Sequence, residues 1–85
     1  MNINNNITVV FFGHYSDHFG GEPLQVAMTE GSTVRSLIDT LEAHYPSLQN
    51  LEQHCRFAVD AEYVNVDALL TPDCEVAVLP PMSGG

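Results

Sequence analysis

Two short segments near opposite ends of the sequence carry apolar side chains on both of their faces. Residues 7–12 read ITVVFF and residues 75–79 read EVAVL. β-Branched and aromatic residues are typical of strands, and a strand that is apolar on both faces is usually covered by neighbouring elements. We therefore predict that these two segments lie side by side and parallel at the centre of one sheet.

A second strand and one helix are predicted between them. Residues 24–29 alternate between apolar and polar side chains, which predicts a strand joined to the first one as a hairpin. Ser32 or Thr33 can cap a helix, and the apolar residues that follow have helical spacing. Pro46 disfavours helical geometry at Tyr45, so this helix is expected to end there.

The segment after the helix contains two shorter strands. Residues 56–59 and 63–65 are predicted strands, Leu48 and Leu51 are expected to anchor the loop before them, and residues 69–73 read as a second loop with an apolar anchor. The order strand, strand, helix, short strands, strand is that of the β-grasp fold. We thus expect an α+β protein whose mixed sheet carries one main helix on one face.

Length and charge limit the classes of function. The 85 residues, 1–85, suffice for a single small domain, so a deep catalytic cleft would have to be shared with a partner. Eleven acidic residues, two arginines and no lysine give a net charge of -9, which disfavours nucleic acid and anionic membranes as partners. A basic protein partner fits better, although the charge can also serve solubility alone. Without a signal peptide or a long apolar run, the expected location is the cytoplasm.

The cysteines and histidines do not predict a metal site. Cys55 and Cys74 lack C-x-x-C spacing and are expected to be reduced, small apolar fillers. His14 and His18, with Asp17, are a weak alternative as metal ligands, and ordinary surface positions are the favoured interpretation of both histidines.

The sequence ends in two glycines that follow two prolines, an apolar residue and a hydroxyl residue. Glycine has no Cβ atom, so such an end can enter a channel too narrow for other residues and carry its carboxylate into another protein's active site. The prolines fix φ and remove two backbone donors, so the last strand must end where they begin. A frayed chain end is the alternative interpretation. The predicted tail, 80–85, consists of Pro80, Pro81, Met82, Ser83, Gly84 and Gly85.

Four stretches of the sequence together carry a family resemblance. They are residues 10–13 (VFFG), 30–34 (EGSTV), 57–60 (FAVD) and 75–85 (EVAVLPPMSGG). These stretches resemble the small, sulfur-carrying subunits of molybdopterin synthase, within the ubiquitin-like MoaD/ThiS family. The double proline before the diglycine is typical of the molybdopterin members, whereas the thiamin-thiazole sulfur carriers usually lack it.

The resemblance implies a function for Gly85, the last residue, and its neighbour Gly84. An E1-like adenylating enzyme would use ATP to adenylate the Gly85 carboxylate, and a sulfur donor would convert the adenylate to a thiocarboxylate. The large synthase subunit would then install this sulfur on the cyclic pterin precursor, in a heterotetramer of two small and two large subunits. By itself the chain is expected to be no enzyme and to bind no cofactor or metal, because catalytic groups would lie in the large subunit and ATP is consumed by the activating partner.

Some apolar surface must also serve these partners. Phe12, Phe57 and Leu79 are candidates for it, together with the tail residues 80–83. For the two phenylalanines, a position in the core is the alternative.

The resemblance leaves other functions open. The same tail would suit a sulfur carrier for thiazole or amino-acid biosynthesis, a ubiquitin-like protein modifier, or a plain β-grasp interaction module. The chain also departs from the family pattern in three places: residues 14–18 replace basic residues, Asp60 replaces an asparagine, and residues 72–74 replace an Asp-Gly-Asp turn. These departures bear on which partner is recognised, and the last predicts a different turn geometry.

Overall fold

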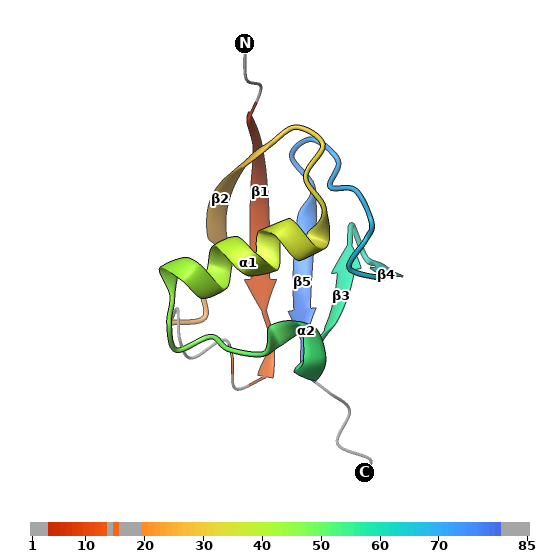
Figure 1. The fold of residues 1–85 in the computed structure, drawn as a ribbon. Coiled ribbons are helices and arrows are strands. Elements are labelled where there is room, and N and C mark those ends of the chain that lie inside the picture. The colour runs from red at the N-terminus through yellow and green to blue at the C-terminus, as the bar shows by residue number, and fades with distance from the viewer. Residues whose placement is uncertain (1–3, 14, 16–19, 81–85) are drawn as a thin grey trace.

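A five-stranded sheet lies behind two helices (Figure 1). The computed structural model describes residues 4–13, 15 and 20–80. Its elements in chain order are β1 (Asn4–Phe11), β2 (Leu24–Thr29), α1 (Val34–His44), α2 (Leu51–His54), β3 (Arg56–Val59), β4 (Glu62–Val64) and β5 (Glu75–Leu79).

The sheet has the strand order β2-β1-β5-β3-β4. Its interior strands β1 and β5 run parallel, with Val9 opposite Val76 and Phe11 opposite Val78, and the other pairs are antiparallel. This confirms the predicted parallel pair of terminal strands. Because the two strands are parallel, β5 ends at the same end of the sheet as β1, and the tail begins there.

Helix α1 begins and ends as predicted. Thr33 is its N-cap, and the Oγ1 atom accepts a hydrogen bond from the Ser36 N–H at 3.2 Å. The backbone N–H of Tyr45 closes the last turn on the carbonyl of Leu41 at 2.8 Å. Neither α1 nor α2 is long and apolar enough to cross a membrane.

The core lies between α1, α2 and the sheet face behind them. The apolar stripe of the helix meets alternate side chains of the strands there. Its fully buried members, each at most 2% exposed, are Ile7, Val9, Val34, Leu37, Ile38, Leu41, Leu48, Leu51, Cys74, Val76 and Val78. The predicted anchors Leu48 and Leu51 are thus confirmed.

The bounds of two strands and the presence of one helix differ from the sequence prediction. β1 begins at Asn4 because Asn4, Asn5 and Asn6 continue the antiparallel ladder to β2. β4 spans Glu62–Val64, one residue earlier than expected. α2 lies where only a loop was predicted, because a helix of four residues leaves almost no periodic signal.

Candidate functional site

The exit of the chain from β5 is held by two strands. The backbone N–H of Phe12 donates to the Val78 carbonyl at 3.1 Å, and Leu79 lies opposite Arg56 of β3. Pro80 follows and is half-buried. The tail therefore begins two residues after Val78, which is paired with β1 on one side and with β3 on the other.

Gly13 lies directly against this exit. Its φ is +66°, a conformation that residues with a side chain rarely adopt. A Cβ atom on Gly13 would lie 2.8 Å from Cγ of Pro80, so the proline ring occupies the space that a side chain would need. The sequence gave no signal of the contact between Gly13 and Pro80, because the two residues are distant in sequence.

The remaining tail residues predicted as the reactive and partner-binding end lie outside the described part of the chain. Their roles stay predictions. They are Pro81, Met82, Ser83, Gly84 and Gly85.

The face of the sheet turned away from the helices carries an apolar patch near this exit. Side chains alternate along a strand, so residues next to the buried Val9, Phe11, Val76 and Val78 point to this open face. Phe12 and Tyr63, the latter opposite Ala58 in the sheet, are large apolar side chains that remain exposed, at 44% and 72%. We define the open-face patch as Val10, Phe12, Arg56, Tyr63, Ala77 and Leu79.

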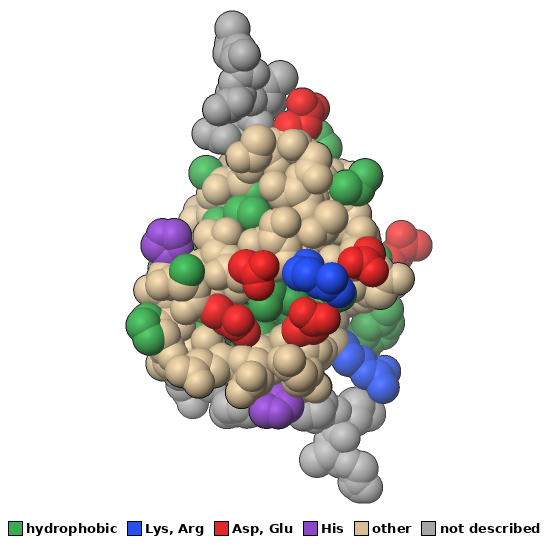
Figure 2. All heavy atoms as spheres, in the orientation of Figure 1, with side chains coloured by type: hydrophobic (Ala, Val, Ile, Leu, Met, Phe, Trp, Pro, Cys, Tyr) green, Lys and Arg blue, Asp and Glu red, His purple; other side chains and the backbone are tan. Residues whose placement is uncertain are grey.

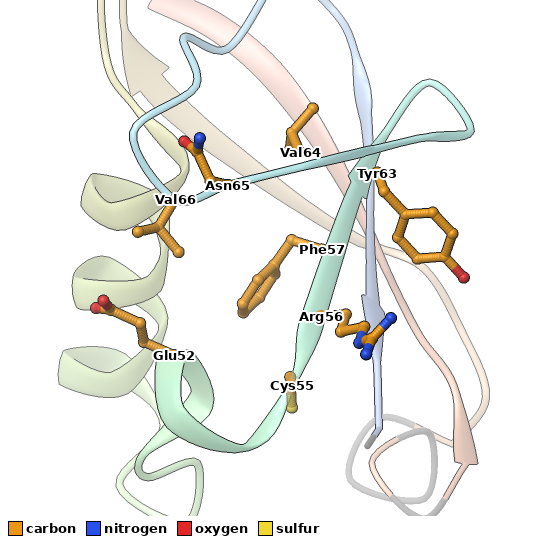
Figure 3. Close-up of a pocket in the computed structure, with 8 residues that line it drawn as sticks. All are labelled: Glu52, Cys55, Arg56, Phe57, Tyr63, Val64, Asn65 and Val66. Atoms are coloured by element: carbon orange, nitrogen blue, oxygen red, sulfur yellow. The ribbon is translucent and has the colours of Figure 1, made fainter. Parts of the chain in front are cut away.

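The exposed position considered for Phe57 is wrong. Phe57 pairs with Val78 in the ladder and is 4% exposed, so it belongs to the helix-covered face. Figure 3 shows its ring pointing toward α2, whereas Arg56 and Tyr63 point to the other side of β3. Of the three candidates, Phe12 and the half-buried Leu79 lie on the open face, and Phe57 is core.

A hollow of about 360 Å³ opens between α2 and the β3–β4 edge (Figure 3). Its single carboxylate, that of Glu52, lies 3.4 Å from the Arg35 guanidinium, and it holds no histidine. Among the described residues, no three metal-binding side chains gather at one point. The hollow is lined by Glu52, Cys55, Arg56, Phe57, Tyr63, Val64, Asn65 and Val66.

Both cysteines are free, and the structure buries one of them fully. Cys74 is 2% exposed, as a core filler should be. Burial raises the pKa of the Cys55 thiol, and a hydrogen bond with Tyr15 opposes part of that rise. Burial also raises the pKa of the Tyr15 phenol, and Cys55 adds to that rise. Cys55 is therefore protonated at neutral pH and is a poor nucleophile.

The helix-covered side carries a cluster of charged side chains. Arg35 lies 3.4 Å from Glu52 and 3.5 Å from Asp67, and Figure 2 shows acidic side chains gathered around a cationic one on this side. Both pairs are exposed, so they contribute little to stability. Arg56, the other cationic residue of the sequence, belongs to the open-face patch.

A model of the ThiS family matches residues 9–85 of the chain. The chain belongs to the ThiS family. It is 34% identical over 82 residues to the molybdopterin synthase sulfur carrier subunit of Caenorhabditis elegans, covering 94% of this chain and 98% of that protein. The subunit of Arabidopsis thaliana is 32% identical over 79 residues, covering 93% and 82%.

Solved structures share the fold of this ThiS-family chain. A putative molybdopterin converting factor, subunit 1, from Pyrococcus furiosus has a TM-score of 0.80 at 22% identity, covering 92% of this chain and 99% of that one. SAMP1 from Haloferax volcanii has a TM-score of 0.80 at 20% identity, covering 95% and 100%. At these identities the likeness shows the fold alone, and it confirms the predicted ubiquitin-like β-grasp arrangement.

Two departures from the family pattern meet at the start of β5. Asp60 has a φ of 49°, and Asp73 a φ of 56°, so both take the left-handed conformation that glycine and asparagine favour. The backbone N–H of Asp60 donates to the Glu75 carbonyl at 2.8 Å, and the Glu75 N–H donates to Asp60 Oδ1 at 3.0 Å. Asp60 therefore ties the β3–β4 turn to β5. The third departure, at residues 14–18, lies outside the described residues except for Tyr15. The weak metal site predicted at His14, Asp17 and His18 falls within this stretch, so it stays a prediction.

Proposed function

We propose that this chain is the sulfur carrier subunit of a molybdopterin synthase and that Gly85 carries the sulfur as a thiocarboxylate. Relatives with that subunit name align over nearly the whole chain and support a sulfur carrier role in molybdenum cofactor biosynthesis. The observation that carries the proposal is the position of β5, an interior strand bonded on both sides that leads directly into the proline-diglycine end.

The tail supplies the reacting group and its partners supply the catalysis. In the first step a carboxylate oxygen of Gly85 attacks the α-phosphorus of ATP, which releases pyrophosphate and leaves an acyl adenylate. A donor of sulfide-level sulfur, written as HS⁻, then attacks the acyl carbon, expels AMP and leaves the thiocarboxylate. Its sulfur is ionised at neutral pH and has no side chain beside it, as a nucleophile that must enter a narrow pocket requires. Hydrolysis of the discharged acyl group returns the carboxylate.

Two partners follow from this cycle. An E1-like enzyme would adenylate Gly85, and the large synthase subunit would hold the catalytic groups for transfer to the pterin, in a heterotetramer of two small and two large subunits. The open-face patch is the surface proposed for their docking, because it lies next to the tail exit and exposes Phe12 and Tyr63. The net charge of -9 suits basic partners and would accelerate their association.

Intact-mass spectrometry tests the proposal directly. The chain is incubated with the activating enzyme of its own genome, ATP and a sulfur donor, and the mass should change by the replacement of one oxygen with sulfur. A chain lacking Gly84 and Gly85 should keep its thermal stability and gain no sulfur. If ATP is consumed but the mass of the full chain does not change, the proposal is contradicted. Covalent adducts of the chain on lysines of other proteins would indicate a protein modifier instead.

A further inference from the structure

The contact between Gly13 and Pro80 differs from every other glycine environment that the structure describes. Four glycines with positive φ are described, at positions 13, 20, 21 and 31. An added Cβ would meet no atom within 4 Å at the last three, whereas at Gly13 it would meet the Pro80 ring, with Cγ at 2.8 Å and Cβ and Cδ each at 3.6 Å. Backbone conformation alone therefore explains three of these glycines, and Gly13 has an additional packing role.

The contact lies at the junction between β5, which ends at Leu79, and the tail, which begins at Pro80. Phe12 still donates to Val78 of β5, and Pro80 is the first residue beyond that strand. The pyrrolidine ring fixes φ of Pro80. The ring lies close to the backbone of Gly13 at the point where the chain leaves the sheet.

We propose that Gly13 is a positioning residue for sulfur loading, because its missing side chain lets the Pro80 ring lie against the backbone just beyond β1 and so orients the start of the tail for the activating enzyme. The inference rests on the proposed function and adds one determinant to it. It concerns the direction in which the tail starts, whereas the open-face patch, to which neither Gly13 nor Pro80 belongs, is the surface proposed for docking of the body.

A change at this contact bears on the tail that follows it. Pro80 is the residue from which the rest of the tail continues, so a displacement of its ring changes the starting direction of the residues that follow. Misplacement of a reacting group by about 1 Å can cost a factor of about 100 in rate. A methyl group on Gly13 must push the Pro80 ring away and would misdirect the tail in this way.

Four variants of the full chain test the proposal in the sulfur-loading assay followed by intact-mass spectrometry. For Gly13→Ala we expect kcat to fall roughly 10- to 100-fold with KM unchanged within about twofold, because docking is intact while the tail is misdirected. Gly20→Ala is the matched control, since Gly20 has a φ of +63° and nothing within 4 Å. It should load at the wild-type rate within about twofold, as expected of a substitution away from any contact.

The third and fourth variants remove the steric conflict. Pro80→Ala deletes Cγ and keeps Cβ, which at 3.6 Å is in ordinary contact. This variant alone should load somewhat more slowly than wild type, because the stiff ring is lost. The double variant, Gly13→Ala with Pro80→Ala, should load as fast as Pro80→Ala alone, which a merely structural role of Gly13 would not produce.

The outcomes separate this inference from the function on which it rests. Failure of the wild-type chain to acquire sulfur would contradict the proposed function itself. If the wild type loads normally, any of three results would overturn the positioning role. The first is an equal loading rate for Gly13→Ala and Gly20→Ala, and the second is a change confined to KM. The third is a double variant that loads as slowly as Gly13→Ala. A measurement on the wild type is independent of any folding defect: nuclear Overhauser contacts between the Gly13 α-protons and the Pro80 ring are expected, and their absence would equally overturn it.

Discussion

The backbone N–H of Leu51 donates to Glu42 Oε2 at 2.9 Å, so a side chain of α1 caps the start of α2. Asn50, at the N-cap position, has a φ of 59° and makes no capping hydrogen bond with its own side chain. Glu42 supplies that acceptor from nine residues earlier in the sequence. This bond holds α2 against α1 at the point where Leu51 enters the core.

Replacing Glu42 should therefore destabilise the fold. We expect Glu42→Ala to lower the free energy of unfolding by about 1–2 kcal/mol, because a partly buried helix-end N–H loses its acceptor. Glu42→Gln keeps an acceptor oxygen and should cost less. Asp39→Ala, an exposed change on the same helix, should stay within about 0.5 kcal/mol. Urea unfolding measures all three, and equal values for Glu42→Ala and Asp39→Ala would show that the bond contributes nothing.

The turn between β3 and β4 should be improved by glycine. Asp60 and Ala61 have φ values of 49° and 72°, the two positive angles of a type I′ hairpin turn. Ala61→Gly removes the steric cost of alanine in this region and should stabilise the protein by about 0.5–1 kcal/mol. Asp60→Gly should instead destabilise it, because the hydrogen bond from the Glu75 N–H to Asp60 Oδ1 is lost. Thermal unfolding of the two variants would contradict this account if Ala61→Gly melted below the wild type.

The open-face patch should contribute to binding of the large subunit. Phe12→Ala removes an exposed ring beside the tail exit and should weaken the complex by about 1–2 kcal/mol, or roughly 5- to 30-fold in Kd. Leu69→Ala is the matched control, since Leu69 is 65% exposed and lies opposite Thr33 beside the start of α1. Calorimetric titration with the large subunit would argue against the patch if both variants bound equally well.

The free energy of unfolding should fall at alkaline pH, and ionisation of the Cys55 thiol should cause part of that fall. Its pKa and that of Tyr15 are raised in the folded protein above their ordinary values of 9.0 and 10.0. The native state therefore holds these protons more tightly than the unfolded state. The resulting stabilisation is complete below the ordinary pKa values and is lost as the pH rises through the raised ones. Cys55→Ala should flatten the decline of unfolding free energy above pH 9.0, and slopes identical to wild type would refute the assignment.

Local patterns were sufficient to predict most of the elements. Three elements were predicted from residues within or next to them, and the structure confirms each one. They are the strand Leu24–Thr29, the helix capped by Thr33 and the strand Arg56–Val59. The parallel pairing of β1 with β5 followed from their two-sided apolarity. Such patterns report burial and backbone preference, which are properties of neighbouring residues.

Features that depend on distant residues could not be predicted in this way. The N-terminus of α2 is capped by Glu42 of α1, and no residue within the four-residue helix indicates that this segment is helical. The face of Phe57 was undetermined because every residue of the run FAVD except the last is apolar, and only the register with β5 places it inside. The contact of Gly13 with Pro80 joins residues from different ends of the chain, and the fold alone brings them together.

The parallel pairing of β1 and β5 also determines how the molecule bears tension. A partner that draws in the tail pulls β5 along its own axis, and the ladders to β1 and β3 resist that pull. Their hydrogen bonds lie across the direction of force, so they are sheared together instead of opening one after another. In the proposed cycle, the force on the tail would thereby be shared across the middle of the sheet, so the domain would stay folded while its end is held and released.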